Sequence, residues 1–235
     1  EPLLQKIDAV PESRMFLRNA ISAEMPGMRT ALGPNLLGVL ERNERREDQL
    51  SVFEIGRVFA PPTSDDSLPV QPITLGILIA DARLKPDEDA RLFSALKGVI
   101  KGVGNAVERA VPRLEQGGVT VPWAHPVRQA QVTVNGQLIG YVAEVHPMTL
   151  HALDLKHRAV IAELDLDAWR KQPEVPTGYS PLPKFPAVFR DFAVVVDESI
   201  RAQDIHEAIS VVAPVQIRDV KFQSVFRGGD LPDGR

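Results

Sequence analysis

Residues 129–145 read QAQVTVNGQLIGYVAEV, and this stretch predicts the type of sheet that the chain forms. Two apolar runs flank Asn135-Gly136, the dipeptide that most readily supplies the two positive φ angles of a type I′ turn. We therefore predict an antiparallel hairpin with strands at 129–134 and 138–145. This hairpin is the clearest local signal in the chain.

Three other segments have the pattern of strands. Residues 50–59 alternate and are rich in valine, phenylalanine and isoleucine, and they end before Pro61-Pro62. Residues 73–79 form a continuous apolar run with the length of a strand that is covered on both faces. Residues 159–166 have alternating apolar residues, which also indicates a strand.

Apolar residues at helical spacing mark the segments between these strands. Leucines recur at three- and four-residue steps over 34–46, where Pro34 suits a first helical turn. The same spacing runs through 90–110 despite three glycines. A short helix is predicted at 147–153. Strands and helices mixed in this way predict an α+β fold.

A proline-rich connector divides the chain. Residues 171–186 contain five prolines, a composition typical of semi-rigid linkers, so we predict domains at 1–170 and 184–235 joined by a linker at 171–183. The second domain is predicted to contain a strand, a helix and a strand, at 192–196, 202–212 and 216–226. This βαβ-like half unit leaves a sheet edge open and has too little core to stand alone.

Composition excludes several classes of protein. The chain has no cysteine, which removes thiol catalysis, iron–sulfur clusters and disulfides and makes the cytoplasm the default compartment. No membrane span or leader peptide is apparent, so a soluble protein is expected. With 27 basic and 31 acidic residues the net charge is −4, and a nucleic-acid role would need a local basic patch.

The histidines do not form a recognisable metal site. His146, His151 and His157 are five and six residues apart, so a helix would not align them on one face. A structural hydrogen-bonding role is favoured for them. Gly98, Gly102 and Gly104 lack the strand and the Lys-Ser/Thr ending of a phosphate-binding loop.

Carboxylates form a second candidate site. Glu163, Asp165 and Asp167 alternate, so on a strand all three side chains would point to the same side and could serve acid/base chemistry or hold Mg²⁺. A solvated strand face is the simpler reading of the same pattern. The charged run over 41–48 nearly cancels itself and is most simply a solvated helix face.

Several strings in the chain occur together in one known family. They are EMPGMRTALGPNLL at 24–37, FEIGRVF at 53–59, EVHP at 144–147, ELDL at 163–166 and KFPAV at 184–188. In this order they resemble the β subunit of bacterial phenylalanyl-tRNA synthetase, and the resemblance covers nearly the whole chain. The family's β subunit is far longer, so the chain resembles a C-terminal fragment of it.

The resemblance implies a fold and a set of partners. Residues 1–170 would form a class II synthetase-like antiparallel module without catalytic activity, and 184–235 the N-terminal half of a ferredoxin-like anticodon-binding domain. The implied partners are the synthetase α subunit, in a heterotetramer, and the anticodon region of tRNA(Phe), with no membrane and no DNA. ATP and Mg²⁺ would serve the whole ligase, with no cofactor in this fragment.

Two departures from a working active site are implied. Where the related α-subunit motif continues into an arginine that grips ATP, this chain has Ala60 followed by two prolines. Where a glycine-rich segment is expected, it has Glu163, Asp165 and Asp167, whose charges would repel a triphosphate. We therefore expect no catalytic residue and no metal ligand here.

The resemblance also singles out individual residues. Arg190 and Arg227 are weak candidates for contact with tRNA, and Arg57 is expected to order its motif through a local ion pair. The other structural motif residues are Arg29, Pro34, Glu54, Gly56, His125, Pro126, His146 and Pro147. Two alternatives stay open: a stand-alone paralogue that acts as a protein-interaction module, and a carboxylate-dependent nucleotide enzyme built on residues 163, 165, 167 and 146.

Overall fold

The computed structural model describes residues 2–21, 26–62, 68–85, 88, 90–107, 109–174, 184–212, 217 and 219–226. The chain forms two compact units, residues 1–178 and residues 179–235. Each unit is described by itself. Within the described ranges, no helix combines the length and the apolarity that crossing a membrane requires.

The first unit is organised around a six-stranded sheet in which every neighbouring pair is antiparallel. Its spatial order is β1-β2-β6-β5-β4-β3. The strands are β1 (Gln49–Arg57), β2 (Ile73–Asp81), β3 (Arg113–Glu115), β4 (Ala124–Val134), β5 (Gln137–Val145) and β6 (Arg158–Asp165). The mixed α+β fold and its antiparallel sheet are therefore confirmed.

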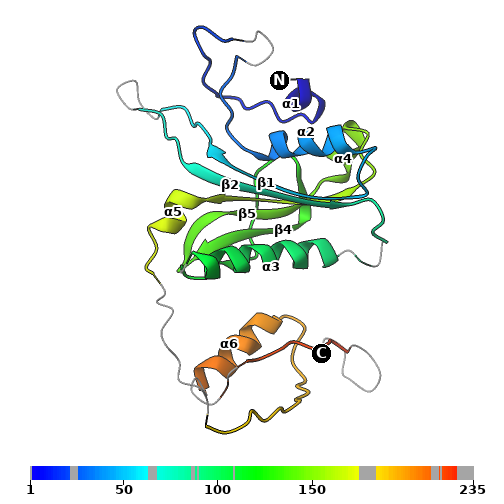
Figure 1. Cartoon of the computed structure of the whole chain (residues 1–235), viewed down its shortest axis with the longest axis vertical. Coiled ribbons are helices and arrows are strands. Elements are labelled where there is room, and N and C mark those ends of the chain that lie inside the picture. The colour runs from blue at the N-terminus through cyan, green and yellow to red at the C-terminus, as the bar shows by residue number, and fades with distance from the viewer. Residues whose placement is uncertain are drawn as a thin grey trace. The chain divides into compact units, whose positions relative to one another are not determined.

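Helices cover both faces of this sheet (Figure 1). One face carries α2 (Gly33–Asn43), with α1 (Pro2–Lys6) and α4 (Pro147–Ala152) beside it. The other face carries α3 (Ala90–Ala106), and Trp169 of α5 (Leu166–Arg170) is buried in the same core. Each face has its own apolar core, so the sheet is the middle layer of three.

The predicted hairpin is confirmed. Val134 is paired with Gln137, and Asn135 and Gly136 have φ angles of 51° and 76°. These positive values are those of a type I′ turn. β4 begins at Ala124, earlier than predicted, and its register with β5 is irregular between Ala124 and Gln129.

The position of a strand in the sheet explains its burial. β2 and β6 lie side by side in the interior of the sheet, and their residues are mostly buried, which confirms the doubly covered strand predicted at 73–79. The interpretation of residues 163–167 as a solvated strand face is wrong at Glu163, which is 7% exposed. Alternation along β6 therefore did not indicate a face in water.

The second unit confirms one of its three predicted elements. The helix α6 spans Ala202–Val212. The strands predicted at 192–196 and 216–226 are absent from the described residues there, where the chain has no regular structure. A strand needs a neighbour to receive its backbone hydrogen bonds. Phe192 and Phe226 are correspondingly 85% and 73% exposed.

Candidate functional site

The candidate site lies where β6 passes beneath the first residues of α2. The Glu163 carboxylate accepts hydrogen bonds from the backbone N–H groups of Leu32 and Gly33, each at 2.8 Å. The first N–H groups of a helix have no partner within the helix and attract anions. Glu163 therefore acts as a cap for α2 that is supplied from a strand 130 residues later in the chain.

Two aromatic side chains complete the surroundings of this carboxylate. Tyr141 on β5 donates its hydroxyl proton to Glu163 Oε1 at 2.7 Å and accepts a hydrogen bond from Trp123 Nε1 at 3.0 Å. Burial of the phenol raises the pKa of Tyr141 well above its usual value, and the negative charge of Glu163 adds to this effect. The phenol therefore remains a donor to the carboxylate at neutral pH.

The space around Glu163 is filled. A Cβ atom added at Gly33 would lie 2.8 Å from Trp123 Cε2 and 2.9 Å from Glu163 Oε1. On the other side, a Cβ atom at Gly140 would lie 1.9 Å from the Glu163 carbonyl oxygen. These two glycines let helix, indole and strand approach one another closely, and the approach leaves little room for a ligand beside the carboxylate.

The two following carboxylates also bind backbone donors. Asp165 accepts from Ala168 N at 2.8 Å and thereby caps α5. Asp167 accepts from Ile73 N at 3.0 Å, which ties α5 to the first residue of β2. The expectation that residues 163, 165 and 167 share one side of a strand is wrong for Asp167, because β6 ends at Asp165. In the part of the chain that the structure describes, no three acidic or histidine side chains are arranged to hold a metal ion.

Residues of the FEIGRVF string, at 53–59, contact Arg29. Arg29 forms an ion pair with Glu54, and its Nε donates to the Arg57 carbonyl oxygen at 2.8 Å. Arg57 instead donates Nη1 to the Gln71 carbonyl oxygen at 2.8 Å. Arg29 therefore makes the ion pair that was expected of Arg57. The spacing of residues along the strand did not indicate Arg29, because Arg29 lies on another segment.

The remaining motif residues serve local structure. His146 Nδ1 accepts from Met148 N at 3.0 Å and caps α4, in which Pro147 is the first residue. His125 Nδ1 accepts from the N–H groups of residues 127 and 128, and the Pro126 carbonyl accepts from the Gln129 amide. Desolvation, followed by the charge of the nearby arginine at 128, lowers the pKa of His125. Pro34 lies in the first turn of α2.

Sequence reasoning favoured a hydrogen-bonding role for His157 but missed the partners and the burial of His157 and Glu144. His157 is 1% exposed, pairs with Glu44 through Nδ1, and places Nε2 2.8 Å from the Glu47 carbonyl oxygen. The charged run over 41–48 is thus not wholly a solvated face. On the neighbouring strands, Glu144 binds both Arg128 and Arg158. A charged residue inside a charged run gives no sequence signal of burial, because its partner lies on a distant element.

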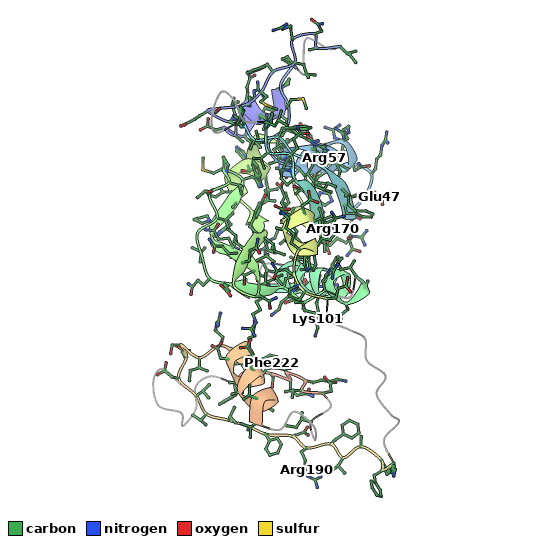
Figure 2. All side chains as sticks on the ribbon, turned by 90° about the vertical axis from the view of Figure 1, so that its left-hand side faces the viewer. Glu47, Arg57, Lys101, Arg170, Arg190 and Phe222 are labelled. Atoms are coloured by element: carbon green, nitrogen blue, oxygen red, sulfur yellow. The ribbon has the colours of Figure 1, made fainter. Side chains whose placement is uncertain are left out.

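The arginines considered for RNA contact belong to the second unit. Arg190 is exposed on an irregular segment, and its Nη1 donates to the neighbouring Phe189 carbonyl at 3.1 Å (Figure 2). Arg227 lies outside the described residues. From position 181 onward the sequence has seven basic and eight acidic residues, so this unit has no net positive charge.

Comparison with known proteins gives two family matches. Residues 3–166 match the phenylalanyl tRNA synthetase beta chain CLM domain, and residues 183–235 match the ferredoxin-fold anticodon binding domain. The phenylalanine–tRNA ligase β subunit of Symbiobacterium thermophilum is 32% identical over 94% of this chain, and that of Clostridium tetani is 30% identical over 93%. The matched regions are 25% and 27% of those relatives, so the chain spans about a quarter of their length.

Similarity to a solved structure concerns the fold alone. The crystal structure of pyrrolysyl-tRNA synthetase from Desulfitobacterium hafniense superimposes with a TM-score of 0.55. It is 15% identical, and the match covers 72% of this chain and 58% of that one.

Proposed function

Because this chain belongs to the phenylalanyl-tRNA synthetase β chain family, we propose that it is a non-catalytic part of phenylalanine–tRNA ligase. In this proposal the first unit is a scaffold for the catalytic α subunit, and the second contributes to recognition of the tRNA(Phe) anticodon. The ligase attaches phenylalanine to tRNA in the cytoplasm, using ATP and Mg²⁺. The match to the β chain over most of the sequence supports this assignment.

The proposed architecture of the first unit is that of a class II synthetase core. Its six antiparallel strands and the structural similarity to another synthetase support this reading. We assign residues 1–170 to this module, 171–183 to the linker and 184–235 to the anticodon-binding domain. The stand-alone paralogue is the weaker alternative, because the family matches cover both units.

The main support for a non-catalytic role is the way in which the Glu163 carboxylate is bound. Its carboxylate is bound to the two backbone N–H groups at the start of α2 and to Tyr141, and the next two carboxylates bind backbone donors as well. Ala60 stands where an arginine would hold ATP. These residues do not fit a nucleotide and its metal ion, since a carboxylate repels phosphate and the oxygens of these three are already bound to internal donors instead of converging on a site for Mg²⁺.

A scaffold needs a surface for its partner, and β1 offers one. β1 is an edge strand, and Phe53 and Ile55 are 70% and 57% exposed on it. Open edges with apolar side chains are normally covered in native assemblies. We propose that the α subunit covers this edge.

Co-purification tests the scaffold role. The chain and the α subunit are expressed together, and the complex is measured by sedimentation. We expect Phe53→Lys together with Ile55→Lys to weaken the complex at least tenfold, whereas Val127→Lys, an exposed valine on β4, leaves it unchanged. Equal binding by both variants would remove the β1 edge from the proposal.

A separate titration tests the RNA contribution. Arg190 and Arg227 are proposed to touch tRNA phosphates, and the sequence from position 181 onward has no net positive charge, so binding is expected to be weak and to fall steeply with salt. Filter binding at 50 and 200 mM salt measures this. Tight binding that is insensitive to salt contradicts the proposal. A rise in melting temperature with ATP and Mg²⁺ that Asp165→Ala abolishes would instead favour a nucleotide enzyme.

A further inference from the structure

We propose that Glu163 is a built-in ligand, which occupies a carboxylate-binding pocket of the first unit and keeps that pocket closed to other molecules. The inference deepens the proposed non-catalytic role and rests on it. The pocket is formed by the N–H groups of Leu32 and Gly33 at the start of α2, the Tyr141 hydroxyl and the Trp123 indole. A small free carboxylate would bind there once the Glu163 side chain is cut back.

The arrangement of donors matches a carboxylate ligand. Each oxygen receives a separate backbone donor at 2.8 Å, and Oε1 receives the phenolic proton as well. Hydrogen bonds to a charged acceptor are stronger than those between neutral groups, and they strengthen further away from water. The three donors belong to Leu32, which precedes α2, to Gly33 of α2 and to Tyr141 of β5, so none of them is removed when the Glu163 side chain is shortened.

The geometry also distinguishes a ligand from an ordinary helix cap. A cap is normally supplied by the residue that precedes the helix, here Leu32, which has no side-chain hydrogen bond. Glu163 instead reaches the helix from the central strand β6, with its own surroundings of Trp123, Tyr141 and Gly33. The pocket is therefore a three-dimensional site that its carboxylate occupies from outside the helix.

Chemical rescue of the full 235-residue chain tests this inference. Glu163→Ala removes the carboxylate and leaves space, and we expect its melting temperature to fall by about 4–8 °C. Sodium formate at roughly 50 mM, compared with chloride at the same ionic strength, should restore about 2–4 °C with a saturating dose response. The wild-type chain should show no formate-specific shift, because its own carboxylate fills the pocket.

Two matched variants exclude general effects. Leu96→Ala makes a cavity in the core on the α3 face and should be destabilised without responding to formate. Glu163→Gln keeps the volume, so it should be destabilised and also fail to respond. An equal formate shift in Leu96→Ala, or wild-type stability of Glu163→Gln, overturns the inference.

The design remains decisive if Glu163→Ala does not fold in chloride. Recovery of folded protein during refolding in formate then supports the pocket. Failure to recover it in formate, under conditions in which Leu96→Ala refolds, overturns the pocket. Neither result involves the α subunit or tRNA, so the inference can fail while the scaffold role stands.

Discussion

The guanidinium of Arg29 occupies the space beside Gly56 in which any other residue would place its Cβ atom. A Cβ at Gly56 would lie 2.0 Å from Arg29 Nη2. The same arginine pairs with Glu54 and donates to the Arg57 carbonyl oxygen at 2.8 Å. One side chain from the loop before α2 thus contacts Glu54, Gly56 and Arg57 of β1, and the glycine of FEIGRVF makes this close approach possible.

Gly56→Ala should therefore displace Arg29. The guanidinium is flexible and can swing away, so the cost is that of its lost contacts, about 1–2 kcal/mol of unfolding free energy. Urea denaturation measures this value. Gly98→Ala is the control, because a Cβ there meets nothing within 4 Å on helix α3, and the substitution should stabilise the chain by about 0.5–1 kcal/mol. The same sign for both variants would contradict the role assigned to Gly56.

Gly140→Ala should be much more damaging than Gly56→Ala. A Cβ at Gly140 would meet the Glu163 carbonyl oxygen at 1.9 Å, and this backbone atom belongs to the central strand β6. Backbone in the middle of a sheet cannot swing away, so we expect a loss of about 3 kcal/mol or more. Urea denaturation of both variants gives the comparison. A smaller loss for Gly140→Ala than for Gly56→Ala would show that β5 and β6 can separate at this point.

Tyr141 should make the chain sensitive to alkali. The pKa of Tyr141 is raised well above its usual value in the folded state, whereas in the unfolded state it returns to about 10. Above pH 10 the unfolded chain therefore loses this proton first, and it binds fewer protons than the folded chain. Stability consequently falls as pH rises, by up to about 1.4 kcal/mol per pH unit from this group.

Tyr141→Phe isolates this contribution. At pH 7 the substitution should cost about 1–3 kcal/mol, because Trp123 Nε1 and Glu163 both lose a partner. By pH 11 the difference between the variant and the wild type should have shrunk by about 1 kcal/mol, since only the wild type contains the titrating phenol. Urea denaturation at pH 7, 9 and 11 tests this. A difference that is constant across these values would show that the phenol titrates normally.

The sequence predicted local structure where the signal was local. The φ preferences of Asn135 and Gly136 are enough to predict the turn, and the apolar composition of residues 73–79 is enough to predict a buried strand. The contacts of the candidate site could not be predicted in this way, because the residues that form it are far apart in the chain. Glu163 could be identified as a departure from an active site, but its bonds to Leu32 and Gly33 depend on how α2 lies over β6.

In the second unit, a local signal was not enough to predict the structure. The continuous apolar run FAVVV at 192–196 is typical of a strand, yet no ladder forms there in the described residues. Strand propensity describes a surface that fits a sheet and cannot supply the neighbouring strand. Helix α6, whose hydrogen bonds are internal, forms as predicted.

The buried pair of Glu44, the residue after α2, and His157 should contribute far more than the exposed pair of Glu41 on α2 and Lys6 on α1. The side chains of Glu44 and His157 are 13% and 1% exposed, and Glu44 also accepts from Lys156 N at 2.8 Å. Glu44→Gln replaces an acceptor of two hydrogen bonds beside a His157 side chain that stays buried, which should cost about 1–3 kcal/mol. Glu41→Gln is the matched control, because Glu41 and Lys6 are 34% and 53% exposed and water screens their charges. We expect less than about 1 kcal/mol for it. Urea denaturation at pH 7 measures both, and equal costs would show that His157 gains nothing from the carboxylate that it contacts.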